Sequence, residues 1–343
     1  MPVQTIYEVL GNGLTRPGSK LPCPACGENK LWIKKNEQVS ICYGCGKKFY
    51  PRPEYKRAWI TALLGKLFAD WQPGLWSSKT TMAYLTETRR VHPAVVRHSN
   101  IARVPYGYNL YDAEQVARQQ IENEARFYES RGEAYDKREE LDLLASATQK
   151  LVALVGDGKG AKGSAEGWIA FFYNDRRGGF VSINFRLPDA EKKAFQSFPP
   201  LPGTRAGIFN SHLASSDDDC TLPAWKDILT DDRLLVFEGE FNQLQWLSLL
   251  ARIAVAQGIE PQQLYTWSCA LGSASHPDLR TVAKLCKEPI LCYDNDEAGK
   301  SVLEKLKEVS FGLAITTPCP GSDMDSYVRQ FGDDDNAAAR AME

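Results

Sequence analysis

The segment RLLVFEG, Arg233–Gly239, decides the fold class of this chain. Its apolar run LLVF is typical of a buried strand, which then ends in an acid, Glu238, and a turn residue, Gly239. The residues that follow, FNQLQWLSLLARIAVAQG at 241–258, predict a helix. A buried strand followed directly by a helix indicates an α/β unit with a parallel sheet.

The same alternation continues toward the C-terminus. Residues 264–272, LYTWSCALG, predict a strand with a glycine turn, and residues 276–286, HPDLRTVAKLC, predict a helix. Residues 288–299, EPILCYDNDEAG, predict a further strand that ends in acids, and residues 301–312 predict the helix that precedes 314–332. In such a module, functional sites collect at the carboxyl ends of the strands.

Acidic residues follow three of these strands. Glu238 closes the first strand, Asp294 and Asp296 close the third, and Asp323 and Asp325 follow the fourth. Because the ends of parallel strands converge on one crevice, these carboxylates are expected to share a site. Oxygen ligands suit one or two Mg²⁺ ions, or Mn²⁺. The Gly-Lys-Ser in DNDEAGKS is not a P-loop, because Asp294 stands where the first glycine is needed.

Composition sets the class of protein. The chain has 343 residues, 43% of them hydrophobic and 24% charged, with a formal net charge of −2. This length favours two or three globular domains. No apolar run is long enough for a membrane helix, and the start MPVQTIYEVLGNG does not have the character of a signal peptide. We expect a cytoplasmic protein without membrane association.

Four cysteines near the N-terminus form two Cys-x-x-Cys pairs, Cys23 with Cys26 and Cys42 with Cys45. This spacing predicts a structural zinc site with four protein ligands, and the apolar alternation between the pairs predicts a short hairpin, as in a zinc ribbon. Two disulfides or a rubredoxin-like iron site are the alternatives. The other five cysteines have no paired spacing, and we assign them to packing.

The front of the chain is basic. Between Lys20 and Arg57 there are nine Lys and Arg against three acids, an excess of six positive charges. A basic patch suits phosphate binding, and it also suits an ordinary solvated face. The charged stretch 111–150 predicts a helical hairpin. The segments GWIAFFY, GGFVSINFRLPD and AGIFN predict short strands.

Several of these segments resemble one family. LLVFEGEFNQL is similar to the Glu-Gly motif of the TOPRIM domain, ILCYDNDEAGKS to its Asp-x-Asp motif, and PGSDMDSYVRQFG to the later Asp-x-Asp of primases. A four-cysteine ribbon ahead of TOPRIM is the arrangement of DnaG-type DNA primases, including those of phages. MAYLTETRRVHPAVVRHSNIARVP and GWIAFFYNDRRGGFVSINFRLPD resemble parts of the primase catalytic core. The resemblance covers about residues 20–330.

The resemblance implies an α/β fold with defined parts. They are a zinc ribbon (1–52), a linker and helical start of the core (53–110), a hairpin insertion (111–150), a basic subdomain (151–230), a TOPRIM domain (231–331) and a tail (332–343).

The implied function is Mg-dependent synthesis of short RNA primers on single-stranded DNA from ribonucleoside triphosphates. Glu238, Asp294, Asp296, Asp323 and Asp325 would be the catalytic and metal-binding acids. Glu238 would be a ligand or the base for the attacking 3′-hydroxyl. The residues assigned to substrate binding are Arg186, Lys192, Lys193 and Lys162, with Lys159 nearby. In the ribbon, aromatic and lysine side chains would contact the template: Trp32, Tyr43, Phe49, Tyr50, Lys34, Lys35, Lys47 and Lys48.

One departure from the family concerns the acidic site. Primases usually carry an aspartate four residues after the TOPRIM glutamate, and this chain has Asn242 there. Asparagine keeps a carbonyl oxygen but loses the charge, so weaker metal affinity is expected at that corner.

Two other functions use the same features. A RecR-like recombination mediator also places a four-cysteine zinc element before TOPRIM, without nucleotidyl transfer. A TOPRIM nuclease shares the acids, whereas a topoisomerase needs a gate domain for which this chain has no room. We expect a separate replicative helicase as partner and hypothesise that the 111–150 hairpin is an interaction element.

Overall fold

A computed structural model describes residues 20–21, 26, 28, 30–33, 40–45, 48–49, 57–132, 135–156, 163–174, 179–188, 195–196, 201, 207–210, 233–261, 268–270, 288–297, 299–300, 313–316 and 326–327. The chain divides into two compact units, Met1–Ala58 and Trp59–Glu343. Each unit is described separately below.

The first unit contains a small antiparallel sheet with the strand order β1-β2-β3-β4. Its strands are β1 (Lys20–Leu21), β2 (Leu31–Ile33), β3 (Ser40–Cys42) and β4 (Lys48–Phe49). Strands β2 and β3 pair with Leu31 opposite Cys42 and Ile33 opposite Ser40. The hairpin predicted between the two cysteine pairs is therefore confirmed.

The second unit begins with helices. Helix α2 (Ala58–Ser77) buries an apolar stripe of residues four apart, since Trp59, Leu63, Leu67 and Trp71 are all at most 2% exposed. Helix α3 (Lys79–Ala83) runs directly into a π-helical turn, η1 (Tyr84–Thr88), and α4 (Pro93–His98) follows. The π-helical turn is notable because such turns often occur at functional sites.

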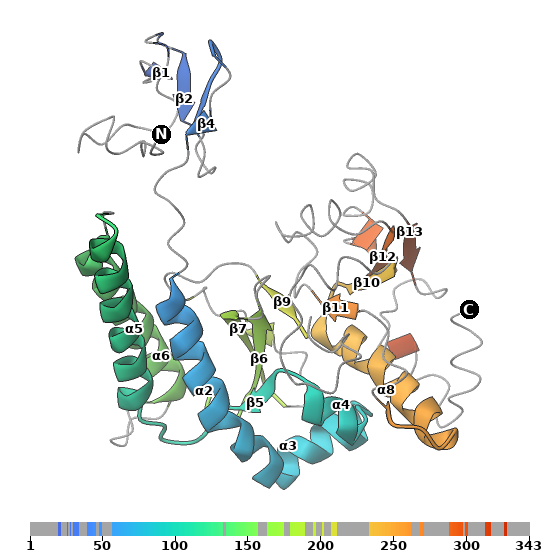
Figure 1. Cartoon of the computed structure of the whole chain (residues 1–343). Helices are drawn as coiled ribbons and strands as arrows, with labels where there is room; N and C mark the ends of the chain where they lie inside the picture. The colour runs from blue at the N-terminus through green and yellow to red at the C-terminus, as the bar shows by residue number, and fades with distance from the viewer. Residues whose placement is uncertain are drawn as a thin grey trace. The chain divides into compact units, whose positions relative to one another are not determined.

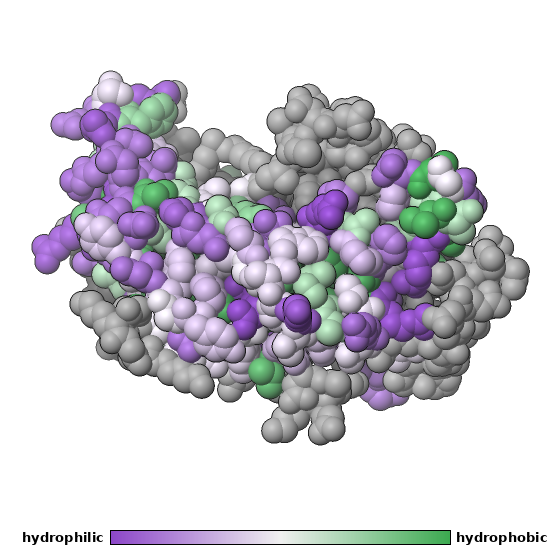
Figure 2. Space-filling model, turned by 90° about the horizontal axis from the view of Figure 1, so that it is seen from below, coloured by the Kyte–Doolittle hydropathy of each residue, from purple (hydrophilic) through white to green (hydrophobic). Residues whose placement is uncertain are grey.

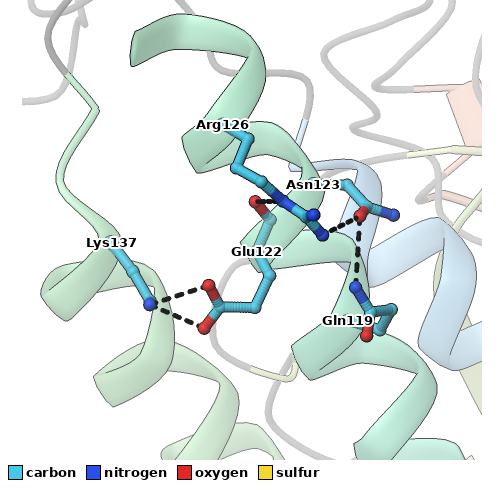
Figure 3. A network of polar contacts seen from close by, with 5 residues as sticks. All are labelled: Gln119, Glu122, Asn123, Arg126 and Lys137. Atoms are coloured by element: carbon cyan, nitrogen blue, oxygen red, sulfur yellow. Dashed lines mark hydrogen bonds and ion pairs between the residues drawn. The ribbon is translucent and has the colours of Figure 1, made fainter.

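Residues 111–155 form a helical hairpin made of α5 (Tyr111–Ser130) and α6 (Lys137–Val155). The two helices lie side by side and next to α2 (Figure 1). A polar network on α5 links Gln119, Asn123 and Arg126, and Lys137 of α6 pairs with Glu122 of α5 at 2.6 Å (Figure 3). Their inner faces belong to one core cluster with α2, so the hairpin is an integral part of this unit.

The main sheet of the second unit has the strand path β13-β12-β10-β11-β9-β6-β7-β8, with β5 paired to β6. One half is antiparallel: β5 (Ile101–Arg103), β6 (Ile169–Asn174), β7 (Phe180–Arg186), β8 (Phe195–Gln196) and β9 (Ile208–Phe209). The other half is parallel: β10 (Arg233–Phe237), β11 (Ser268–Ala270), β12 (Glu288–Tyr293) and β13 (Leu313–Thr316). The predicted α/β class with a parallel sheet is confirmed.

Helix α8 (Glu240–Ala256) follows β10 and packs against both halves of this sheet. It contacts β10, β11 and α4, and Figure 1 shows it alongside the parallel strands. Phe241, Leu244 and Leu247 of α8 share one core cluster with Phe171 of β6 and Phe237 of β10. The N-terminal end of α8 is therefore fixed from both halves of the sheet.

The surface view in Figure 2 shows hydrophilic residues prevailing over the helical hairpin, with apolar residues in small groups. Within the described part of the chain, no helix is long and apolar enough to cross a membrane.

Candidate functional site

Two of the predicted acids lie at neighbouring strand ends. Strands β10 and β12 are parallel neighbours with Phe237 opposite Cys292, and Glu238 directly follows this pair. The Glu238 backbone N–H donates a 3.3 Å hydrogen bond to the Cys292 carbonyl. Asp294 comes directly after the end of β12. The predicted convergence of Glu238 and Asp294 on one edge of the sheet is thus observed.

The Glu238 carboxyl group is close to Tyr293. Burial raises the pKa of the Tyr293 phenol above its usual range, and the nearby Glu238 carboxylate raises it further. Oε2 of Glu238 is shielded from solvent. One predicted acid therefore stands in a partly desolvated position, where the field of a charge is stronger than in water.

Asn242, in the first turn of α8, occupies the position where the family usually has an aspartate. Its side-chain Nδ2 donates a 2.9 Å hydrogen bond to Oδ1 of Asp294. Asn242 is 5% exposed and Asp294 is half-buried, so the donor of this contact is shielded from solvent. The departure from the family pattern therefore acts directly on a predicted catalytic acid.

Asp296 shapes the turn that follows β12. Its Oδ1 accepts a 2.8 Å hydrogen bond from the Gly299 N–H, and its carbonyl accepts a 3.0 Å bond from the Lys300 N–H. A Cβ at Gly299 would lie 2.2 Å from the Asp294 carbonyl oxygen, so only glycine fits this close approach. Asp296 is itself exposed, with one carboxylate oxygen engaged by the backbone.

The second acid of the EGE segment has a different role. Glu240 is 1% exposed and accepts a hydrogen bond from the Tyr173 hydroxyl, with Asn184 Nδ2 3.5 Å away. Burial raises the pKa of Tyr173 well above its usual range, and the Glu240 carboxylate adds to this effect. Glu240 therefore ties α8 to the antiparallel half of the sheet.

Two arginines lie over one aromatic ring at the start of α8. The guanidinium carbon of Arg186, a predicted substrate-binding residue, is 4.5 Å from the centroid of the Phe241 ring. The guanidinium carbon of Arg89 is 4.1 Å from the same centroid. Phe241 directly precedes Asn242 in α8, and Asn242 contacts Asp294. Glu238, Asp294 and Asn242 are called the acidic corner below.

Arg89 was not singled out from the sequence. It follows η1 within MAYLTETRRV, and its position depends on contacts with α8. Gln245 donates to the Arg89 carbonyl, Arg252 Nη1 donates to the Arg90 carbonyl at 3.1 Å, and Ser248 Oγ accepts from the His92 N–H at 2.9 Å. The feature of the sequence that could have identified Arg89 is its position directly after YLTET, in a segment that resembles the primase core.

In the first unit, Cys26 and Cys45 lie on turns and are exposed, as is Tyr43, which is 66% exposed. The Cys42 backbone ends β3. In the second unit, Cys269 and Cys292 are buried, in keeping with the packing role expected for them. Considering the described residues alone, no group of three His, Cys, Asp or Glu side chains is placed to hold a metal ion.

The remaining predicted site residues lie outside the described part of the chain or are described there only by their backbone. Outside it are Cys23, Asp323, Asp325, Lys159, Lys162, Lys192, Lys193, Lys34, Lys35, Lys47 and Tyr50. Trp32, Lys48 and Phe49 contribute backbone to β2 and β4.

One curated protein and several solved structures are similar to this chain. No protein-family model matches the chain. A curated DNA primase of Enterococcus faecalis is 26% identical over 171 residues, which is 48% of this chain and 25% of that protein. The match therefore spans a quarter of the relative's length.

Among solved structures, the zinc-binding and RNA polymerase domains of the Aquifex aeolicus primase match 99% of this chain and 82% of that chain. The TM-score is 0.50 and the identity 16%. A DnaG primase catalytic domain bound to single-stranded DNA matches 84% of this chain and 82% of that chain, with a TM-score of 0.51 and 17% identity. The chain has the fold of these domains.

Proposed function

We propose that this chain is a DNA primase that synthesises short RNA primers on single-stranded DNA. The observation that carries the proposal is the placement of Glu238 and Asp294 at adjacent parallel strand ends. The helix that follows Glu238 carries Phe241, over which Arg89 and Arg186 lie. The curated relative named DNA primase supports it. In this proposal the region 231–331 is a TOPRIM domain.

The acidic corner would hold divalent cations. Carboxylate oxygens at the end of a sheet suit Mg²⁺ or Mn²⁺, and the ligands would be Glu238, Asp294, Asp296 and Asp323, with Asp325 as a further acid of the site. When bound, the metal would neutralise charge on the α-phosphate and the departing pyrophosphate. Glu238 would be a metal ligand or the group that accepts the proton of the attacking 3′-hydroxyl.

Arg89 and Arg186, which lie over the Phe241 ring, would hold the triphosphate. Guanidinium groups bind phosphate oxygens through two parallel hydrogen bonds, and they also stack on aromatic faces such as that of Phe241. Arg89 and Arg186 come from different halves of the chain, so the folded core is required to bring them together. Lys162, Lys192 and Lys193 would add positive charge.

The N-terminal unit would be a zinc ribbon that contacts the template. Thiolates from two Cys-x-x-Cys pairs are a typical structural zinc set. Cys26 lies on a turn between β1 and β2, and Cys45 lies on a turn between β3 and β4. Tyr43, exposed between Cys42 and Cys45, is suited to stacking on an unpaired base.

A separate replicative helicase is the proposed protein partner, and the α5–α6 hairpin is a proposed contact. Because the inner face of the hairpin belongs to the core, deleting it would also remove core packing. Substitution of its exposed Phe127, which is 53% exposed, tests the contact without that damage. Unchanged helicase stimulation in Phe127→Ser would count against this surface of the hairpin.

Primer synthesis tests the function directly. The full chain is incubated with single-stranded DNA of mixed sequence, labelled ribonucleotides and Mg²⁺. Short RNA products support a primase. Single-stranded DNA binding without any product, also in the presence of candidate helicases, would favour the RecR-like mediator, and degradation of the template would favour the nuclease.

A further inference from the structure

We propose that Asn242 is a positioning residue that compensates the charge of Asp294, so that the acidic corner is assembled before a divalent cation binds. The uncharged Asn242 side chain also makes the acidic corner bind cations more weakly than it would with a carboxylate at position 242. This inference rests on the proposed function, because it concerns how that site takes its metal.

The contact has one chemically sensible orientation. A carboxylate oxygen is an acceptor, so the group of Asn242 that faces Oδ1 of Asp294 at 2.9 Å must be the NH₂ donor. The Asn242 oxygen therefore points away from Asp294 Oδ1. Instead of adding a ligand beside Asp294, the side chain occupies one of its lone pairs.

The position of Asn242 is fixed by its neighbours on α8. Glu240 is held by Tyr173 of β6, and Gln243 Nε2 donates to the carbonyl and the hydroxyl of Ser268 in β11, at 2.9 and 3.2 Å. Glu240 and Gln243 are both at most 1% exposed. Asn242 lies between these anchors in the first turn of α8, and it is 5% exposed. Little freedom remains for the amide to turn away.

The absence of charge on the side chain at position 242 determines how this contact affects the acidic corner. Glu238 and Asp294 already place two carboxylates at neighbouring strand ends. A third carboxylate at 242, within hydrogen-bond distance of Asp294, would repel it unless a cation lay between them. With asparagine, that repulsion is replaced by a charge-assisted hydrogen bond. The corner thereby gains order in the metal-free protein and loses one anionic ligand.

The test compares cation affinity and metal-free stability in the full chain. Mn²⁺ binding is measured by calorimetry and by electron paramagnetic resonance, and thermal unfolding is followed in buffer passed over a chelating resin. The variants are Asn242→Asp, Asn242→Ala and Asp294→Ala. Asn123→Asp, on the exposed side of α5, is the matched control because it makes the same change of charge outside the corner.

We expect Asn242→Asp to bind Mn²⁺ at least tenfold more tightly than the natural chain and to unfold at a lower temperature without metal. Asn242→Ala should also unfold earlier without metal, since Asp294 loses the hydrogen bond from Asn242, but should gain less than threefold in affinity. Asn123→Asp should match the natural chain in both measurements.

Equal Mn²⁺ affinity and equal metal-free stability in the natural chain and Asn242→Asp, with binding abolished by Asp294→Ala, would overturn this inference alone. If Mn²⁺ binding is the same in the natural chain and Asp294→Ala, the acidic corner is not the metal site. That result would remove the basis of the proposed function as well.

Discussion

The phenol of Tyr173 donates a hydrogen bond to the buried carboxylate of Glu240, across 67 positions of the sequence. Tyr173 belongs to the antiparallel half of the sheet, and Glu240 begins the helix that carries Phe241 and Asn242. This one contact therefore links the half of the sheet that carries Arg186 to the helix that faces Asp294.

Removing this hydroxyl should weaken the fold. Tyr173→Phe takes away a charge-assisted hydrogen bond from a carboxylate that is 1% exposed, and we expect a loss of about 1.5–3 kcal/mol in the free energy of unfolding. Urea unfolding measures it. Tyr111→Phe, at a tyrosine that is 62% exposed, is the control and should stay within about 0.5 kcal/mol. Equal losses in both variants would show that the Tyr173–Glu240 bond does not stabilise the fold.

Alkaline pH should destabilise the chain through its buried tyrosines. Burial and the Glu238 carboxylate raise the folded-state pKa of Tyr293, so above pH ~10 the unfolded state releases the phenol proton while the folded state keeps it. Stability is therefore lost as the pH rises past about 10.

Tyr293→Phe should reduce that loss. Its unfolding free energy should fall less steeply between about pH 10 and 11, by up to about 1.4 kcal/mol per pH unit. Urea titrations at several pH values measure the slope for both proteins. Parallel slopes would mean that Tyr293 ionises equally in both states.

Gly299 should not tolerate a side chain. In Gly299→Ala the new Cβ would meet the Asp294 carbonyl at 2.2 Å, so the turn must move, at a cost of about 1–3 kcal/mol and with reduced primer synthesis. Gly65→Ala is the matched change, because a Cβ at Gly65, inside α2, has no atom within 4 Å. It should gain about 0.5–1 kcal/mol. A stable, active Gly299→Ala would contradict the described turn.

Arg89 should contribute to nucleotide binding. If its guanidinium contacts the triphosphate, Arg89→Ala should raise KM for ribonucleotides about 10-fold or more, the loss expected for a hydrogen bond to a charged group. Arg118→Ala is the control, since Arg118 is paired with Glu114 on the hairpin at 2.5 Å. Steady-state kinetics of primer extension gives both values. An unchanged KM in Arg89→Ala would exclude this role.

The parallel half of the fold was predictable because its signals are local. The buried run in RLLVFEG, the helix after it and the strand ending at Asp294 follow from apolar patterning, and parallel topology then brings Glu238 and Asp294 together. The stripe of α2 and the hairpin at 111–155 follow from helical patterning in the same way.

The contacts that complete the site were not predictable in this way. Arg89 directly follows a π-helical turn. Side chains of α8, about 150 residues further along the chain, donate hydrogen bonds to the carbonyls of Arg89 and Arg90. Glu240 looks like a further member of the acidic site until its burial against Tyr173 is known. Such contacts depend on how the two halves of the sheet pack together, and the local apolar and polar pattern of the sequence does not determine that packing.

The most direct test of the central claim compares primer synthesis by the natural chain, Asp294→Ala and Glu297→Ala. Glu297 lies in the same turn, but its side chain is 96% exposed. If the corner of Glu238 and Asp294 is the catalytic site, Asp294→Ala should lose about 100-fold or more of the activity, corresponding to several kcal/mol of transition-state stabilisation. Glu297→Ala should retain it. Primer synthesis that survives in Asp294→Ala at the natural rate would contradict the account.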